Sequence, residues 1–264
     1  MRATHLTDFF RALCCMLCVL ALGCSRSAKN APPPADHAQQ AAVPVFHVDP
    51  LTVGSISGTI RYIGRRPAPK LIDMSNDPAC VEAHHGKAFD ESLLVSPSDG
   101  LANAFVYVKT GLEGKHFETP TATVVIDQQG CWFKPRILGI QTNQILQVIN
   151  SDPVTHNIHP MAQINREWNH SQGAGDPPLG RKFIKQEVMI PVKCNIHSWM
   201  RAYIGVLEHP YFAVSKTDGA FTIENLPPGN YTVAVWQEKL GTEERHVVVA
   251  PHSNAKMNIA FKGK

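Results

Sequence analysis

The chain has 264 residues, of which 44% are hydrophobic and 18% are charged. This much apolar material can fill a core, so the composition excludes an intrinsically disordered chain. The formal net charge is +3, from 25 basic and 22 acidic residues. A balance so close to neutral gives no electrostatic case for nucleic-acid binding, and we expect no such partner. The seven cysteines are an odd number, so disulfide pairing leaves at least one thiol to be explained.

Residues 1–23 have the features of an export signal. Arg2 and Arg11 accompany an apolar run from Ala12 to Gly23. A run of this length is typical of a signal-peptide core, because a membrane-spanning helix needs roughly 20 apolar residues. We therefore expect the protein to be exported, and its remaining cysteines to experience an oxidising compartment.

The end of this signal, Leu20-Ala21-Leu22-Gly23-Cys24, resembles the lipobox of bacterial lipoproteins. The resemblance implies lipidation at Cys24, attachment to a membrane through that lipid and, with Ser25 next, sorting to the periplasmic face of the outer membrane. Leu22 stands where a small residue is more usual. The alternative is ordinary cleavage nearby, which would leave a periplasmic or secreted protein.

The next segment is rich in Ala, Pro and Gln and has no hydrophobic period, so we expect residues 24–53 to form an anchored, flexible linker. After it come short runs with β-type alternation, separated by turn residues. No stretch keeps a helical period over three turns, and we predict an all-β sandwich architecture. The expected strands cover residues 56–62, 105–108, 123–126, 145–149, 188–192, 221–223, 231–236, 246–249 and 257–261.

One motif carries metal chemistry. Cys194, His197 and Met200 form the pattern C-x2-H-x2-M, and His156 lies upstream, after the strand expected at residues 145–149. Two imidazoles, a thiolate and a weak thioether are the ligand set that suits mononuclear copper. Zinc fits less well because a thioether is rarely its ligand. The chain has no C-x-x-C-H motif for haem attachment.

These residues resemble the cupredoxins, the blue-copper family that includes plastocyanin and amicyanin, over residues 121–208. The loop has amicyanin-like spacing, and Asn150-Ser151-Asp152 followed by His156 resembles the segment of the first ligand. The resemblance implies a Greek-key sandwich, placed at residues 113–208, with one copper bound by His156, Cys194, His197 and Met200. It also implies that the backbone N–H of Asn157 helps to hold the thiolate. Ile196 stands where many members have proline.

Two alternatives remain open around this site. His159 is a rival for His156, although a residue three positions along a strand faces the opposite side. A Cys80–Cys131 disulfide is the simplest account of the other two cysteines beyond Cys24, because it leaves Cys194 free. The competing possibility is a second metal site at Cys80, His84 and His85.

The C-terminal segment from Thr217 to Val233 contains Asp218-Gly219 and Pro227-Pro228-Gly229 turns. It resembles the second half of a carboxypeptidase regulatory-like domain, a transthyretin-like β-sandwich, and Gly58-Thr59-Ile60 with residues 101–108 resembles the first half. We therefore expect residues 54–112 and 209–264 to form one such sandwich with the cupredoxin domain inserted into it. The alternative places the units in series, beside one another.

The expected function is one-electron transfer by type 1 copper in the cell envelope, with an unidentified redox partner protein. In the resembling family the loop histidine is the usual exit for the electron. Trp199 and Tyr203, beside the loop, either line that docking surface or are ordinary core or rim packing. Copper sequestration or delivery, and a non-redox structural or partner-binding lipoprotein, are the alternatives. We expect no enzymatic activity, because no H-C-H triplet or G-x-S-x-G motif is present.

Overall fold

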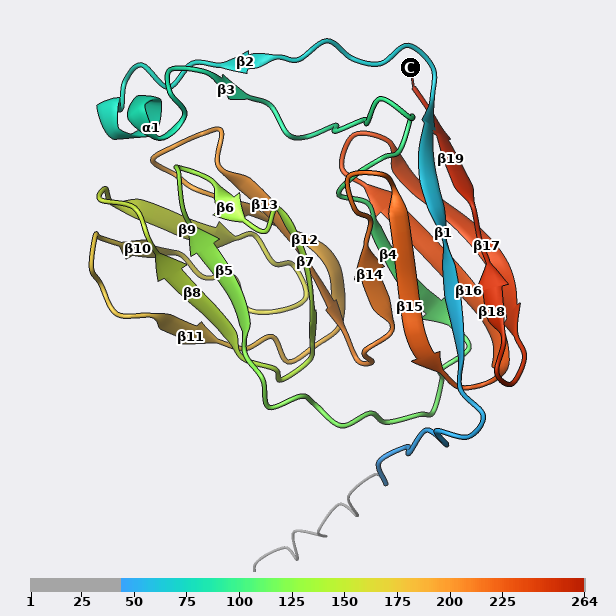
Figure 1. Cartoon of the computed structure of the whole chain (residues 1–264). Coiled ribbons are helices and arrows are strands. Elements are labelled where there is room, and N and C mark those ends of the chain that lie inside the picture. Colours follow the sequence, from blue (N-terminus) through green and yellow to red (C-terminus); the bar gives the residue numbers. More distant parts are fainter. Residues whose placement is uncertain (1–43, 264) are drawn as a thin grey trace, which may run out of the picture. The chain divides into compact units, whose positions relative to one another are not determined.

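The structure is a computed structural model that describes residues 44–263, and these residues belong to one compact unit (Figure 1). The regular secondary structure of the described chain is almost all strand, with the single short helix α1, which confirms the all-β class. Each of the nine expected strands overlaps an observed one. In chain order the elements are β1 (Gly54–Ile63), β2 (Leu71–Ile72), α1 (Pro78–Ala83), β3 (Ala88–Phe89), β4 (Phe105–Thr110), β5 (Val124–Gln128), β6 (Phe133–Lys134), β7 (Ile137–Gln141), β8 (Leu146–Asn150), β9 (His156–Pro160), β10 (His170–Gln172), β11 (Leu179–Arg181), β12 (Glu187–Lys193), β13 (Arg201–Leu207), β14 (Phe212–Val214), β15 (Ala220–Leu226), β16 (Gly229–Gln237), β17 (Gly241–Val249), β18 (Asn254–Lys256) and β19 (Ile259–Lys262).

The first and last parts of the described chain pair with each other, and we call them the flanking sandwich. One sheet has the order β15-β1-β18, with β19 also pairing with β1, and the other has the order β14-β4-β16-β17. Their inward-facing side chains form one core, which includes Ile56, Ile60, Val106, Val233 and Phe261. Alternation along β1 places Ile56 and Ile60 on the buried face, and β15 alternates in the same way.

The strands between β4 and β14 in sequence pair among themselves, and we call them the central sandwich. Its two sheets have the orders β10-β9-β12-β13-β7 and β11-β8-β5-β6. A second core fills it, with Ile126, Val148, Ile158, Ile190 and Ile204 among its fully or almost fully buried side chains. In Figure 1 the central sandwich is drawn in green through yellow to light orange, and the flanking sandwich in blue (β1), green (β4) and orange to red (β14 to β19).

A small third cluster joins the two sandwiches. It consists of Phe105, Ile137, Met189 and Leu207, with Phe212, Tyr203 and Trp236 packed against it. A buried ion pair lies across the same boundary, because Arg136 precedes β7 and Glu238 follows β16. The last residues of the segment expected to be a linker also make contacts, since the Phe46 ring packs edge-on against Phe117.

The connection from β1 to β4 leaves the flanking sandwich, and we call residues 64–92 of it the arm. Asp77 caps α1, and Pro78 at the first helical position suits the helix start. Met74, Cys80 and Ala88 of the arm are buried in the core of the central sandwich. The arm therefore belongs by sequence to one sandwich and by packing to the other.

Pro191 lies in β12, which has a neighbour on each side. Proline in this strand is expected only at an edge or a bulge. The strand carries a bulge between Glu187 and Ile190, where Met189 has a φ of 62°. Pairing with β9 begins at Val192, one residue after the proline. Proline is tolerated because no ladder bond to β9 is needed from its nitrogen.

Candidate metal centre

The Cys194 thiol lies at the end of a strand and faces inward. β12 ends at Lys193, and the following loop closes on itself because the Met200 N–H donates to the His197 carbonyl at 3.0 Å. The Cys194 sulfur accepts the backbone N–H groups of His197 and Asn157, each at 3.4 Å. The residue is 3% exposed. The Asn157 contact is the one that the cupredoxin resemblance implied.

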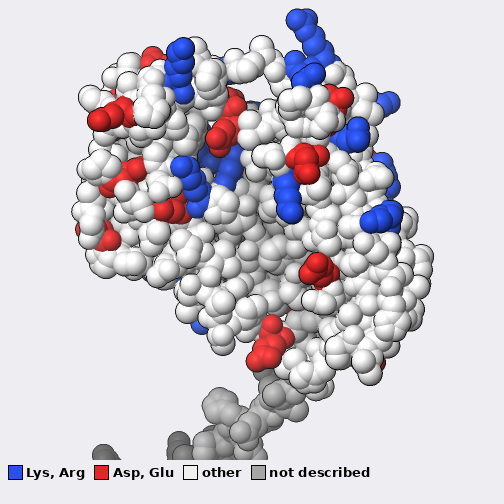
Figure 2. Space-filling view, viewed as in Figure 1, with Lys and Arg blue, Asp and Glu red and all other residues white. Residues whose placement is uncertain are grey.

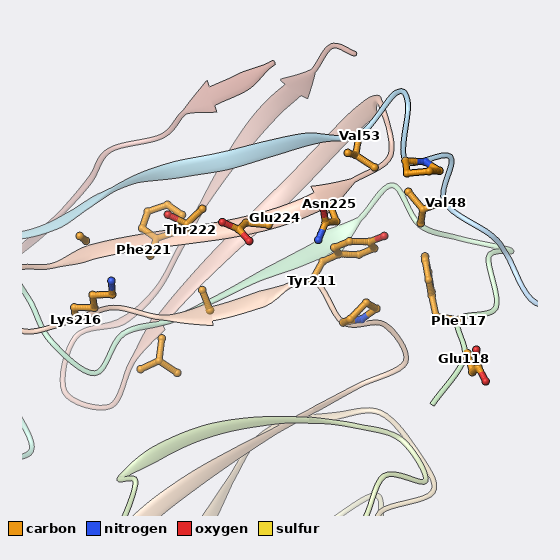
Figure 3. Close-up of a pocket in the computed structure, with 15 residues that line it drawn as sticks. Val48, Val53, Phe117, Glu118, Tyr211, Lys216, Phe221, Thr222, Glu224 and Asn225 are labelled. Carbon is orange, nitrogen blue, oxygen red and sulfur yellow. The ribbon is translucent and has the colours of Figure 1, made fainter. Parts of the chain in front are cut away.

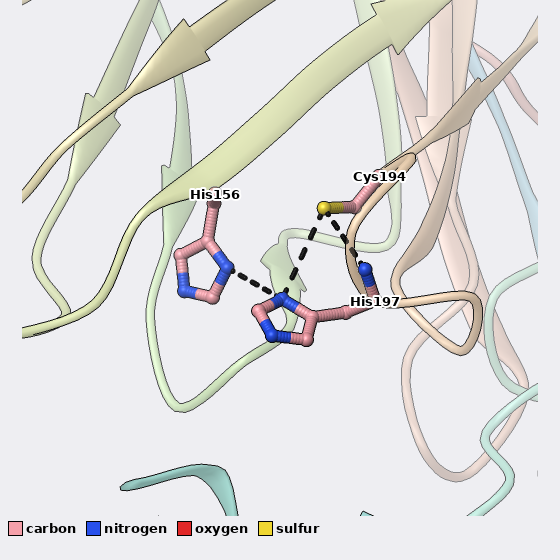
Figure 4. Close-up of side chains that lie close together, drawn as sticks. All are labelled: His156, Cys194 and His197. Atoms are coloured by element: carbon pink, nitrogen blue, oxygen red, sulfur yellow. Dashed lines mark hydrogen bonds between the residues drawn. The ribbon is translucent and has the colours of Figure 1, made fainter. Parts of the chain in front are cut away.

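His156 and His197 complete a cluster with this sulfur (Figure 4). One donor atom from each of the three residues lies within 4.8 Å of the other two. The two Nδ1 atoms are 3.0 Å apart, and Cys194 Sγ is 3.9 Å from His197 Nδ1. His156 is the first residue of β9 and is fully buried. Two strand ends and one loop thus bring three predicted ligands to one point.

Each imidazole is held from behind by a carboxylate. The Nε2 of His156 lies 2.8 Å from Asp152 Oδ2, and the Nε2 of His197 lies 3.0 Å from Asp77 Oδ2. These contacts direct both Nδ1 atoms toward the sulfur, because the far nitrogen of each ring is engaged as a donor. A carboxylate behind an imidazole also raises its basicity as a metal ligand.

Ionisation in the cluster favours a thiolate. Burial opposes ionisation of Cys194, but hydrogen bonds from His156 and from backbone N–H groups outweigh it, so the thiol pKa is lowered. Burial also opposes the charge on His156, yet Asp152 and Cys194 raise its pKa to about 9. The pKa of Asp152 and that of Asp77 are lowered in spite of burial, by the hydrogen bonds that each carboxylate accepts.

Met200, the fourth predicted ligand, is fully buried in the same core cluster as Cys194. Its backbone carbonyl accepts the Cys194 N–H at 3.2 Å, so the residue closes the loop that carries the thiol. A thiolate and two imidazoles whose Nδ1 atoms lie beside it, with a methionine in the same buried core, suit copper better than zinc or a hard cation. The donor chemistry of the described cluster therefore fits a mononuclear copper ion.

His159, the rival ligand, lies elsewhere. Its Nε2 is 2.5 Å from Glu167 Oε1, and its Nδ1 is 3.4 Å from Asn195 Oδ1. It is not a member of the cluster, as the two-residue repeat of a strand predicts for a position three residues away. Of these two rival histidines, the structure brings His156 to the thiol.

Cys80 and Cys131 are joined by a disulfide with a Cα–Cα distance of 5.5 Å. Cys194 is the free cysteine of residues 44–263. A second metal site at Cys80, His84 and His85 is wrong, because Cys80 has no thiolate to offer and His84 Nε2 contacts the Gly130 carbonyl at 2.6 Å. The predicted lipidation site, Cys24, lies outside the described residues.

The structure does not place the loop histidine on an open docking surface. His197 is 3% exposed, because Asp77 and α1 cover its Nε2 edge. Trp199 lies against the His197 ring with centroids 5.1 Å apart. Tyr203 packs against Trp236 of the flanking sandwich at 4.7 Å. Both aromatic residues are therefore partly buried contacts rather than an open surface.

Asp77 and Asp152 were not predicted as functional residues from the sequence. A local pattern could have pointed to Asp152, because it lies four residues before His156, in the turn between the end of β8 and the start of β9. Asp77 before Pro78 is a recognisable helix start. Nothing in the local sequence pointed to His197, which is 120 residues away.

A separate cavity of about 760 Å³ lies in the flanking sandwich, between β14 and β15 (Figure 3). Its walls include Val48, Phe117, Tyr211 and Phe221, with Lys216 and Glu224 as charged members. The candidate ligands do not line it, so it is distinct from the metal centre. No helix within residues 44–263 has the length and hydropathy needed to cross a bilayer.

Comparisons with known proteins give structural likeness alone. No family model and no curated protein matches the chain. A copper-containing nitrite reductase from Thermus scotoductus SA-01 is similar at 19% identity over 36% of this chain, with a TM-score of 0.31, and the match covers 24% of that enzyme. An oxidised amicyanin mutant is similar at 16% identity over 38% of this chain and 97% of its own length, with a TM-score of 0.29. A purple cupredoxin from Nitrosopumilus maritimus is similar at 18% identity over 32% of this chain and 98% of its own length, with a TM-score of 0.27.

Proposed function

We propose that this protein binds one copper ion at His156, Cys194, His197 and Met200 and carries single electrons in the cell envelope. The observation that carries the proposal is the buried Cys194 sulfur, which accepts two backbone N–H groups and lies with two imidazoles in one cluster. Bound copper would supply a centre that is stable in two oxidation states. The chain supplies a thiolate with a lowered pKa and two imidazoles whose Nδ1 atoms already converge.

The test is the visible spectrum of the copper-free protein after addition of Cu(II). We expect an intense thiolate-to-copper band that is absent in Cys194→Ala. His156→Ala should lose more than the roughly 10- to 100-fold in copper affinity that removal of an outer hydrogen bond costs, because it removes a direct ligand. His159→Ala is the matched control, three residues away and outside the cluster, and should keep the band. Zinc binding without the band would contradict the proposal.

Copper storage or delivery is the second candidate, and the burial of His197 favours it. A redox partner gains no direct access to a loop histidine that is 3% exposed. The same copper-loaded sample distinguishes the two. Rapid oxidation and reduction by small inorganic reagents, with slow loss of copper to a chelator, supports electron transfer. Slow oxidation and reduction, with rapid loss of copper to the chelator, supports delivery.

We also propose attachment to the envelope through Cys24 and a weakly charged docking surface. Without residues 1–23 the chain has 23 basic and 21 acidic residues, a net charge of +2. Figure 2 shows basic and acidic side chains interspersed over the visible face. Reduction by a partner protein should therefore depend little on salt concentration.

We further propose that residues 54–112 and 209–264 form a regulatory-like sandwich that scaffolds the inserted copper domain at residues 113–208. Strand pairing supports the nested division, because β1 pairs with β15, β18 and β19, and β4 pairs with β14 and β16. Neither half has enough chain to bury a core of its own. The flanking sandwich carries no role in ligation in this proposal.

A further inference from the structure

The arm is held against the end of the central sandwich that carries the metal centre by more contacts than a connecting loop requires. It leaves β1 after Ile63, buries Met74, Cys80 and Ala88 in the core of the central sandwich, and is linked covalently to that sandwich at Cys131. His84 of the arm adds a contact to the Gly130 carbonyl at 2.6 Å and an edge-on contact with Trp132. Four kinds of contact thus hold this short stretch against one end of the sandwich.

Asp77 divides its carboxylate between the arm and the metal centre. Its Oδ1 accepts the backbone N–H groups of Ala79 at 3.1 Å and Cys80 at 3.3 Å, which caps α1. Its Oδ2 lies 3.0 Å from His197 Nε2. The cap fixes one oxygen, so the other is held in place for the imidazole. Cys80, at the third position of the same turn, carries the disulfide.

The other half of the disulfide is tied to the other imidazole. Asp152 accepts the backbone N–H groups of Gly130 at 2.6 Å and Cys131 at 2.7 Å, and its Oδ2 also lies 2.8 Å from His156 Nε2. The Cys80–Cys131 bond therefore joins two segments, each of which presents a carboxylate to one predicted ligand. Figure 4 shows the two rings that these carboxylates hold, with their Nδ1 atoms toward each other.

We infer that the arm is a positioning and sealing element of the metal centre. Asp77 holds His197 as the tautomer with hydrogen on Nε2, so that its Nδ1 lone pair faces Cys194. The Cys80–Cys131 disulfide keeps Asp77 against the ring and closes the Cys194 thiol to solvent. Asp77 is a positioning residue, since it acts through His197. The inference rests on the proposed function in treating the cluster as a metal centre.

The tautomer test uses Asp77→Asn in the copper-free full chain. Asparagine caps helices as well as aspartate does, so its oxygen stays on the α1 N–H groups and its NH₂ faces His197 Nε2. His197 Nε2 must then accept a hydrogen bond from this NH₂ group, and the ring hydrogen moves to Nδ1. Correlation spectra of the ¹⁵N-labelled imidazole should show Nε2–H in the native protein and its loss in the variant.

Asp73→Asn is the matched control for this measurement. Asp73 lies four residues earlier in the arm and accepts the Ser75 N–H at 2.9 Å without contact to an imidazole. It should leave the His197 tautomer unchanged. Retention of the Nε2–H tautomer in Asp77→Asn would overturn the positioning role.

The sealing test measures alkylation of Cys194 by iodoacetamide in copper-free protein without denaturant. In Cys80→Ala/Cys131→Ala the alkylation rate should rise on the order of tenfold or more, because the arm can open locally without global unfolding. In urea, Cys194 should be alkylated at the same rate in the native protein and in the variants. Equal native rates would overturn the sealing role, and Asp77→Asn, which keeps the disulfide, gives an independent answer on positioning.

These measurements need no metal, so their failure is separable from failure of the proposed function. A protein that takes up no copper but shows the expected tautomer and alkylation changes would reject copper binding and support the arm's role at a thiol–imidazole site. A protein with the copper band but unchanged tautomer and alkylation rates would reject the inference alone.

Discussion

At the scale of single residues, two buried histidines have opposite environments. His156 faces Asp152 and Cys194, and its pKa is raised to about 9. His209 is also buried, but burial lowers its pKa to about 4. Its Nε2 donates to the Val108 carbonyl at 3.0 Å, and its Nδ1 accepts the Tyr211 N–H at 3.2 Å. A second ring hydrogen would point at the Tyr211 N–H, so the fold accommodates His209 only in the neutral form.

This difference predicts loss of stability in mild acid. The folded-state pKa of His209 lies below the value of 6.5 for a free imidazole, so the unfolded chain takes up a proton first as pH falls. The stability that depends on a neutral His209 is fully present above pH 6.5 and is lost as the pH falls to about 4. At about 1.4 kcal/mol per pKa unit, it amounts to about 3 kcal/mol of the free energy of unfolding.

Urea unfolding of the copper-free protein at pH 7 and pH 4.5 measures the effect, with His209→Gln as the comparison. The glutamine side chain offers one donor and one acceptor and does not titrate. The native protein should lose more stability than the variant between the two pH values. An identical loss in both would assign the acid sensitivity to other groups.

At the scale of elements, sequence patterns predicted nine of the observed strands and missed the others, which are either very short or buried on nearly every position. β12 and β16 were expected and are present. β7 and β13 were not expected, because this parallel pair is buried on nearly every position and shows no alternation. His156 and Cys194 could be proposed from spacing and ligand chemistry. The Cys80–Cys131 disulfide was also expected, but the contact of Asp77 with His197 could not be proposed, because 120 residues separate the two and no local pattern links them.

The glycines of β7 and β13 allow the two sandwiches to approach. A Cβ at Gly205 would overlap the fully buried Phe105 ring, and one at Gly139 would overlap Phe212. Gly205→Ala should therefore lower the free energy of unfolding by about 1–3 kcal/mol, the usual cost of overpacking a filled core. Urea unfolding measures it.

Gly180→Ala is the control for this prediction. It is also a strand glycine, but its added Cβ would lie 3.9 Å from the nearest atom, an ordinary contact. The variant should be as stable as the native protein or slightly more stable, since alanine reduces the freedom of the unfolded chain. Equal losses at Gly180 and Gly205 would show that backbone conformation, and not contact with Phe105, sets the cost.

At the scale of the whole molecule, a buried ion pair links the two sandwiches. Arg136 Nε and Nη2 lie 2.6 Å and 3.0 Å from the two carboxylate oxygens of Glu238, and the side chains are 7% and 5% exposed. Arg136 also donates to the Arg201 carbonyl at 3.4 Å. A planar guanidinium and a carboxylate joined by two hydrogen bonds fix the relative orientation of the two sandwiches as well as the distance between them.

Removal of one partner should be far more costly than removal of both. Arg136→Met leaves the Glu238 carboxylate buried without a counter-charge, and we expect a loss of about 3–5 kcal/mol in the free energy of unfolding. Arg136→Met/Glu238→Leu replaces both charges by apolar groups that extend the cluster of Phe105 and Leu207. The double variant should recover most of the loss, because no unpaired charge remains.

Chemical unfolding of the native protein, Arg136→Met, Glu238→Leu and the double variant gives the coupling energy. Near-ultraviolet circular dichroism reports whether the aromatic contacts at the boundary persist. If the two sandwiches depend on each other, the single variant should still unfold in one transition, at lower urea. A single variant with two separate transitions would mean that each sandwich is stable alone. In that case the arm and its disulfide, and not the shared boundary, would hold the metal centre against the flanking sandwich.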